Sequence, residues 1–295
     1  MVSPLLFVGS LGLCAVLTWL GALDASSPEA SSPHHVAPTG AKESVTFKKV
    51  RPAVGDKEKK RKQVESTLKG DVTQGSQKIA MDRSSVSLVE KTEECLEVRK
   101  QECVKLKVSY AKDEERSVTN GKSANKTNPN QGKAYLVVPG KNPTITREDG
   151  SAAPAEEIEE VEGAYDKPPR NAAVLDALPD TVSVGDSLDA LARVFEAELA
   201  DEDDKPKAKV KIVVQSIGEL DGKKIVTLGL TATLEGVSPK AGQMKLEMRG
   251  TLDVLVDGAR VVRSSVGGPM SVELPGGVGT LRGSMKETSS SSFSR

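Results

Sequence analysis

The feature that most constrains this chain is a two-residue alternation of apolar and polar side chains in its second half. Five apolar residues alternate with threonine and glycine over 226–234, and three valine or isoleucine residues alternate mainly with lysine over 208–214. This period places the two sets of side chains on opposite faces of a β-strand. Asp221-Gly222 lies between the two stretches and favours a hairpin turn, because both positions tolerate positive φ.

The same alternation recurs along the chain and predicts an all-β fold with little helix. We expect an antiparallel meander, folded as a partial barrel or a sandwich, with two related modules as one alternative for its organisation. Further strands are predicted at 86–88, 104–110, 134–138, 244–248, 252–256, 259–263, 270–274 and 278–285. The polar stretch 112–132 is expected to be a long exposed loop. The stretch 187–199 places leucine and phenylalanine on one helical face, although a strand is an alternative there.

The N-terminus carries an uncharged apolar run, Leu5 to Leu23. Its length fits a signal peptide or a short membrane span, so residues 1–25 are expected to be cleaved near Ala22 to Ala25 or to anchor the chain. Cys14 is preceded by Leu13 rather than by a small residue, and we interpret it as part of the apolar run rather than as a lipidation site. The protein is therefore expected to be exported to the periplasm, the outer envelope or the extracellular space.

Composition divides the remainder of the chain into modules and connecting segments. Residues 26–44 are rich in Ser, Pro and Ala and form a predicted flexible spacer, which contains His34 and His35. With aromatic residues at only 3%, the core must be built from aliphatic side chains. The predicted units are a first β module at 45–150, a linker at 151–177, a second β module at 178–288 and a disordered tail at 289–295.

Two landmarks occur twice in the same order and suggest an internal repeat. Val54-Gly55-Asp56 recurs as Val184-Gly185-Asp186, and the stretch 132–140 resembles 250–258 because both begin and end with glycine. We expect a turn to open each module and a hairpin to lie near its end. Positive φ at the hairpin tips would be supplied by Gly140 and Gly258. A true duplication and chance similarity both remain open, since glycine is common in turns.

Cys95 and Cys103 are the only cysteines after the N-terminal run, and eight positions separate them. Two adjacent strands joined by a short connection would bring such a pair within bonding distance. In an oxidising compartment a structural disulfide is the leading interpretation. Two independent thiols are the alternative. A redox-active pair is disfavoured, because the spacing is not that of a Cys-x-x-Cys motif.

Charge and histidine content argue against several classes of function. The formal net charge is −1, so nucleic-acid binding is not expected. The basic run 57–62 is interpreted as a solvated strand or loop rather than as a phosphate or lipid-headgroup site, and the acidic run 201–204 as a solvated loop rather than a cation site. Because both histidines lie in the spacer, the body lacks the parts of a Ser-His-Asp triad and of most zinc sites. We therefore expect no catalytic residues, no metal and no cofactor.

The segment Leu178-Pro-Asp-Thr-Val-Ser-Val-Gly-Asp-Ser187 resembles a stretch shared by uncharacterised β-rich bacterial secreted proteins and lipoproteins. This chain differs in having Leu188 where that family usually has tryptophan. The resemblance implies an envelope protein without catalytic residues. Its more distant analogue is the half barrel of the lipoprotein carriers LolA and LolB, which holds acyl chains against a curved sheet.

Three hypotheses of function follow. The first is a non-catalytic envelope protein that binds a lipid or another apolar ligand on a curved β-sheet, in a pocket of roughly 300–1,000 Å³. The second is a structural or interaction module with an envelope protein partner and no small ligand. The third, an enzyme that uses carboxylate, lysine or tyrosine chemistry, is disfavoured. Contact with the membrane is expected only through the N-terminal segment.

Overall fold

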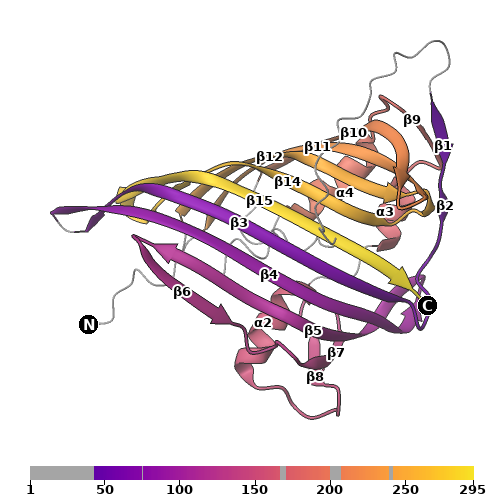
Figure 1. Cartoon of the computed structure of the whole chain (residues 1–295), viewed down its shortest axis with the longest axis horizontal. Coiled ribbons are helices and arrows are strands. Elements are labelled where there is room, and N and C mark those ends of the chain that lie inside the picture. Colours follow the sequence, from indigo (N-terminus) through magenta and orange to yellow (C-terminus); the bar gives the residue numbers. More distant parts are fainter. Residues whose placement is uncertain (1–42, 75, 167–170, 200–206, 239–241) are drawn as a thin grey trace.

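The computed structural model describes residues 43–74, 76–166, 171–199, 207–238 and 242–295 (Figure 1). The predicted signal peptide or anchor, nearly all of the spacer with both histidines, and the acidic run 201–204 lie outside the described residues. Among the described residues, strands dominate and one antiparallel sheet of 11 strands organises the fold. The prediction of an all-β protein with little helix is confirmed.

The strands of this sheet are long and mostly consecutive in the chain. Their spatial order is β10-β11-β12-β14-β15-β3-β4-β5-β7-β8, and β6 pairs with the far end of β5. The bounds are β3 Lys57–Gln74, β4 Gln77–Arg99, β5 Glu102–Thr119, β6 Lys122–Thr127, β7 Ala134–Val138, β8 Thr144–Arg147, β10 Lys207–Leu220, β11 Lys223–Ser238, β12 Gly242–Leu255, β14 Val261–Glu273 and β15 Gly279–Ser294. Two small sheets pair β1 (Ser44–Thr46) with β9 (Thr181–Ser183), and β2 (Lys48–Lys49) with β13 (Asp257–Gly258).

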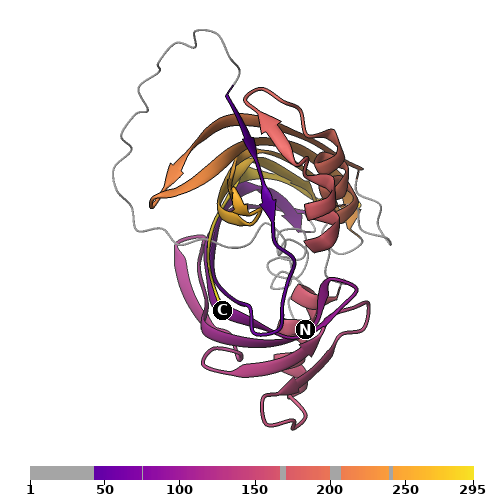
Figure 2. The same cartoon turned by 90° about the vertical axis from the view of Figure 1, so that its right-hand side faces the viewer.

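The large sheet bends strongly about the direction of its strands and forms an open trough (Figure 2). We call the surface that carries the helices its inner face. The helices are α2 (Ala155–Tyr165), α3 (Asn171–Ala177) and α4 (Asp189–Leu199), and a short 3-10 turn covers Pro275–Gly277. Because the large sheet is bent, it encloses its own apolar surface. Within the described residues, no second large sheet packs against it.

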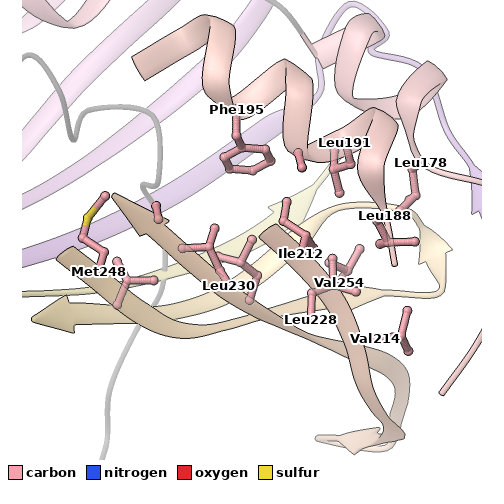
Figure 3. Close-up of a cluster of buried hydrophobic side chains, with 14 of the residues drawn as sticks. Leu178, Leu188, Leu191, Phe195, Ile212, Val214, Leu228, Leu230, Met248 and Val254 are labelled. Carbon is pink, nitrogen blue, oxygen red and sulfur yellow. The ribbon is translucent and has the colours of Figure 1, made fainter. Parts of the chain in front are cut away.

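The larger hydrophobic core lies between α4 and the strands β10 to β14 (Figure 3). The helix predicted at 187–199 is present, and its apolar face points onto the sheet. Leu188, Leu191 and Phe195 from this segment are each at most 6% exposed and lie over Ile212 and Leu230. Because every second residue of these strands faces inward, the alternation in the sequence becomes one continuous aliphatic layer.

A smaller core lies at the other flank of the sheet, beneath α2. Val108, Tyr110, Tyr135 and Val137 of β5 and β7 are buried against Val161 and Tyr165 of the helix. The rings of Tyr110 and Tyr135 meet edge to face, with their centroids 6.1 Å apart. α2 and α3 both fall within the stretch 151–177 that was predicted as a linker.

The last strand joins the two halves of the sheet and corrects one prediction. Residues 289–294 belong to β15 rather than to a disordered tail, and Ser291 to Ser294 pair with Lys60 to Lys57 of β3. Serine is weak evidence for a strand, but small hydroxyls suit a crowded inner face. The Ser264 and Ser289 hydroxyls lie 2.5 Å apart and are buried there.

The predicted loop at 112–132 is also wrong over most of its length. β5 continues to Thr119 and β6 follows, paired from Glu114 to Thr119. All six residues of β6 are exposed. Backbone pairing with β5, rather than burial of side chains, therefore holds this polar strand, and such a strand has no apolar alternation to reveal it.

Candidate functional site

The two Val-Gly-Asp landmarks form the same turn. The Asp56 carboxylate accepts a hydrogen bond from Ala53 N at 3.0 Å, and the Asp186 carboxylate accepts one from Ser183 N at 2.8 Å. Gly55 and Gly185 have φ of 88° and 89°, which favours glycine. The landmarks are thus one structural unit used twice.

Each turn is fixed to a long strand through the same pair of backbone hydrogen bonds. Gly55 N donates to Cys95 O at 2.8 Å and Cys95 N donates to Asp56 O, while Gly185 N and Asp186 O make the equivalent bonds with Val214. β4 and β10, which carry Cys95 and Val214, both have an irregular register at this point. After the first turn the chain continues as β3, whereas after the second it leaves the sheet as α4.

The second landmark is only partly equivalent in structure. Gly140 and Gly258 both have positive φ, 153° and 107°. Gly140 lies between β7 and β8, and Gly258 lies between β12 and β14. Their first glycines differ, because Gly132 lies in a turn with φ of 77° whereas Gly250 lies inside β12. A Cβ at Gly250 would lie 1.9 Å from Ser265 O, so close strand packing explains that glycine.

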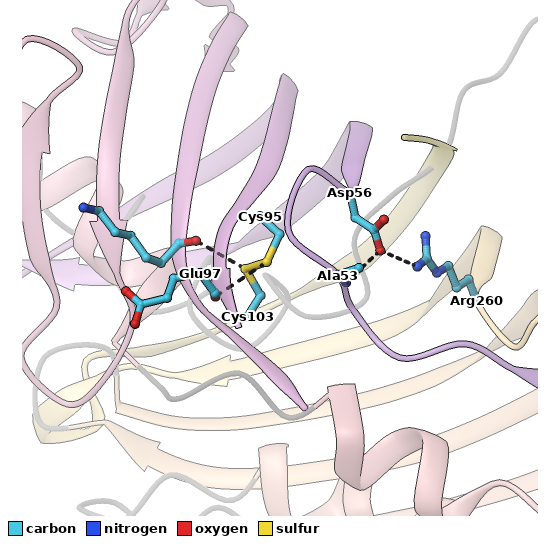
Figure 4. Close-up of a disulfide and its surroundings, with 7 residues drawn as sticks. Ala53, Asp56, Cys95, Glu97, Cys103 and Arg260 are labelled. Carbon is cyan, nitrogen blue, oxygen red and sulfur yellow. Dashed lines mark hydrogen bonds and ion pairs between the residues drawn. A yellow bond between two sulfur atoms is a disulfide. The ribbon is translucent and has the colours of Figure 1, made fainter. Parts of the chain in front are cut away.

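The predicted disulfide between Cys95 and Cys103 is present and links β4 to β5 (Figure 4). Both residues are buried, at 4% and 6% exposure, and their Cα atoms are 5.8 Å apart. Cys95 is also the residue whose backbone is hydrogen-bonded to the first Val-Gly-Asp turn. The crosslink therefore fixes the strand position on which the segment 53–56 is held.

A strip of paired charges crosses the inner face between the two hydrophobic cores. We call it the charged belt, and it consists of Glu58, Lys60, Lys62, Lys91, Glu93 and Glu287. Lys60 Nζ lies 2.8 Å from Glu93 and 3.2 Å from Glu58, and Lys62 Nζ lies 3.1 Å from Glu287. The Tyr165 hydroxyl of α2 donates to Glu93 at 2.6 Å. The run 57–62 is thus not simply solvated, because Lys60 and Lys62 face inward.

Burial and pairing set the protonation of this belt. Burial acts to raise the pKa of Glu93, but the ammonium groups of Lys60 and Lys91 outweigh it and hold that pKa well below its usual value. Burial lowers the pKa of Lys91. Glu287 is fully buried, its pKa is raised by burial, and neither of its oxygens accepts a well-directed hydrogen bond in the described part. With three lysines and three glutamates, the belt has no net formal charge.

An open pocket lies at the end of the trough where β15 finishes. Its volume is about 770 Å³. The walls are backbone segments 48–50, 222–224, 255–260 and 293–295, together with Asp56. Lys48 N bonds to Val256 O at 2.9 Å and Val256 N bonds to Lys224 O at 3.0 Å, so hydrogen bonds join three of the walls. We call this the basic pocket.

The lining of the basic pocket combines apolar surface with an excess of positive charge. Val50, Leu255, Val256 and Phe293 supply the apolar part. The charged side chains are Lys48, Lys223, Lys224, Arg260, Arg295, Asp56 and Asp257. Five cations face two carboxylates, which gives a formal excess of three positive charges.

Asp56 is held between two arginines of the pocket. Arg260 lies 3.1 Å and Arg295 2.7 Å from the two oxygens of its carboxylate. Burial acts to raise the pKa of Asp56, but hydrogen bonds from Arg295, Ala53 N and Arg260 hold it below its usual value. The Arg260 guanidinium also lies 4.8 Å from the centre of the Phe293 ring.

Two residues that the sequence marked as turn residues, Asp56 and Gly258, line this pocket, whereas the cations around them were not predicted. The signal lies in the order of the strands. Lys223-Lys224 follows the turn Asp221-Gly222, and Arg260 follows Asp257-Gly258. In an antiparallel meander β11 and β14 begin at the same end of the sheet, so these cations converge there.

Neither a metal centre nor a spanning helix is found in the described ranges. No group of three or more His, Cys, Asp or Glu side chains in them is arranged to hold a metal ion. Of the helices in the same ranges, none combines the length and the apolar character needed to cross a bilayer.

No protein-family model matches the chain, and no curated protein matches its sequence. Among solved structures, a lipovitellin structure described by its lipid–protein interactions is similar at a TM-score of 0.36 and 4% identity. That match covers 82% of this chain and 26% of lipovitellin, so this chain spans about a quarter of that protein.

Two bacterial structures are similar at a TM-score of 0.15. One is a DUF1329 family protein from Desulfovibrio piger at 9% identity, covering 77% of this chain and 85% of that one. The other is an outer-membrane lipoprotein-sorting protein domain from Vibrio parahaemolyticus at 8% identity, covering 78% and 85%. These values define no family, and the arguments that follow rest on the geometry.

Proposed function

We propose that this chain is an exported, non-catalytic binding protein that holds a lipid-like apolar ligand against the inner face of its curved sheet. The observation that carries the proposal is the 770 Å³ pocket at the end of the trough, with Phe293 and Leu255 in its lining. That volume lies within the usual range for small-molecule sites, which are concave and largely apolar.

The inner face of β15 connects this pocket to the hydrophobic core. Residues two apart share a face, so Phe293, Ser291, Glu287 and Met285 lie along one line. Met285 is 1% exposed and belongs to the larger core. The distance from Phe293 to Met285 is eight residues, or about 26 Å of strand.

Two observations support export and the absence of catalysis. The disulfide Cys95–Cys103 suits an oxidising compartment, and the uncharged run Leu5 to Leu23 suits a signal peptide or anchor. The acids and lysines of the belt are engaged with one another, and no histidine occurs after His35. Such paired groups stabilise the sheet rather than provide a free acid or base.

The test is titration of the purified protein with 1-aminoanthracene, an uncharged fluorescent probe of apolar sites. We expect saturable binding that is displaced by a long-chain alcohol and is weakened at least tenfold by Phe293→Asp. Val138→Asp, at an exposed apolar residue of β7 outside the pocket lining, is the matched control and should bind the probe as the wild type does. A well-folded protein that binds no probe would favour the structural-module alternative, and a protein that stays in the cytoplasm of a bacterial host would refute export.

A further inference from the structure

We infer that the basic pocket recognises an anionic head, a phosphate or phosphodiester group, so that the ligand is an anionic amphiphile rather than a neutral one. This inference rests on the proposed function and adds the chemistry of the ligand's polar end. It is carried by five cationic side chains around one pocket, three more than the carboxylate side chains of the lining.

Lys223 and Lys224 are the least compensated of these cations. Both are exposed at the tip of the β10–β11 hairpin, and no ion pair is found for either one in the described part of the chain. Asp221 and Gly222 have φ of 50° and 71°, a turn that sets where the two lysines begin. The bond from Val256 N to Lys224 O then holds this tip against the pocket wall.

Arg260 and Arg295 provide directed donors from two other backbone segments of the lining. Both share the single carboxylate of Asp56, which leaves one of their two charges uncompensated. A guanidinium has five N–H donors in a planar fork, so each arginine retains donors that do not contact Asp56. The Arg260 guanidinium also lies over the Phe293 ring. Arginines held in this way favour the tetrahedral oxygens of phosphate.

Lys48 adds a further positive charge to the lining from the segment 48–50. Its pairing with Asp257 is weak, since the atoms are 3.8 Å apart and the two side chains are 76% and 80% exposed. An anion between Lys48, Lys224 and Arg260 would therefore meet positive charge from three backbone segments. The charged belt that follows along the inner face is neutral in sum, so positive charge is concentrated at the pocket.

The experiment measures binding of two fluorescent lipids that differ only in the head, pyrene-labelled phosphatidylglycerol and phosphatidylcholine, with 1-aminoanthracene in parallel. We expect the anionic lipid to bind at least about tenfold more tightly at low salt, and this preference to shrink as NaCl increases. The double variant Lys223→Ser/Lys224→Ser should lose most of the preference. Lys209→Ser/Lys211→Ser, two exposed lysines of β10 outside the pocket, is the matched control and should retain it.

Each outcome separates the inference from the function on which it rests. Equal affinity for the two lipids, with 1-aminoanthracene still bound, would overturn the anionic head and leave the apolar-ligand function standing. Loss of all three probes would overturn both. If inorganic phosphate binds the wild-type protein as tightly as the anionic lipid does, the pocket is a site for free phosphate and the lipid-head assignment is wrong.

Discussion

A Cβ atom placed on Gly283 of β15 would lie 1.7 Å from the carbonyl oxygen of Thr67 in β3. Thr67 Oγ1 also lies 3.2 Å from the neighbouring Ser284 N. Gly70 and Gly279 at the same seam are similarly confined, with Thr280 O at 2.3 Å and Asp71 O at 2.2 Å. Close backbone packing at these glycines therefore helps to join the C-terminal strand to the first long strand, alongside side-chain contacts such as Lys62 with Glu287.

Gly283→Ala should accordingly weaken the seam between β15 and β3. We expect a loss of about 3 kcal/mol in the free energy of unfolding, the upper part of the range for overpacking a rigid site. Urea unfolding followed by circular dichroism measures it. Gly218→Ala in β10 is the control, because a Cβ there meets nothing within 4 Å and φ is not positive. Equal effects of the two substitutions would refute the close approach.

Gly55→Ala tests the first docked turn without introducing a clash. A Cβ at Gly55 meets no atom within 4 Å, so its φ of 88° is the whole penalty. The expected cost is about 1 kcal/mol. In the exposed helical position Gly163 the same substitution should instead stabilise the protein by up to about 1 kcal/mol. Thermal unfolding of both variants should show a lower midpoint for Gly55→Ala and a higher one for Gly163→Ala. An unchanged midpoint for Gly55→Ala would argue against backbone strain at this position.

Glu157 of α2 should make stability depend on acid pH. Its pKa is lowered from 4.5 to about 2, mainly by hydrogen bonds from Arg147. Burial acts in the opposite direction, and hydrogen bonds from Lys133 and Tyr135 lower the pKa further. An acid whose pKa is lower in the folded state stabilises that state above its unfolded pKa. This contribution is therefore complete above about pH 4.5 and disappears as pH falls to about 2.

The matching variant is Glu157→Gln. At pH 7 it should cost about 2 kcal/mol, because it removes charge-assisted hydrogen bonds at a side chain that is 2% exposed. The difference in urea midpoint between wild type and variant should narrow steadily below pH 4.5. A difference that stays constant from pH 7 to pH 3 would assign Glu157 a purely steric role.

Reduction of the Cys95–Cys103 disulfide should lower stability by about 2–3 kcal/mol on the chain-entropy account of so short a loop. Unfolding in the presence and absence of a phosphine reductant measures this, and the mass increase of two hydrogens verifies reduction. The double variant Cys95→Ala/Cys103→Ala should be as weak as the reduced protein and insensitive to reductant. An effect of reductant on that variant would show that another site is responsible.

The parts of the fold that the sequence predicts are those with one buried face. The alternation over 226–234 becomes β11 because Val226, Leu228 and Leu234 all lie under α4 and its neighbours at 1% exposure or less. β6 and the serine-rich end of β15 escape prediction for the opposite reason. Their places are decided by backbone pairing with strands far away or by small hydroxyls, which leave no apolar period.

The candidate site is predictable only in part. The turn residues could be recognised because glycine and aspartate have local conformational roles, and Asp56 and Gly258 do line the pocket. The buried role of Glu157 could not, because its partners Lys133, Tyr135 and Arg147 come from two other strands and the turn before them. From the sequence alone the acidic stretch around Glu157 is interpreted as solvent-exposed, because the basic partners that neutralise Glu157 are distant in the chain.

The pairing of β15 with β3 has a consequence for the order of assembly. Ser291 and Glu58 touch although 233 positions separate them. The meanders on either side can form from neighbouring hairpins, whereas this contact must wait for nearly the whole chain, and long-range pairing of this kind is slow. Until it forms, β15 and β3 are both unprotected edges. Premature self-association during biosynthesis would therefore begin at those two strands.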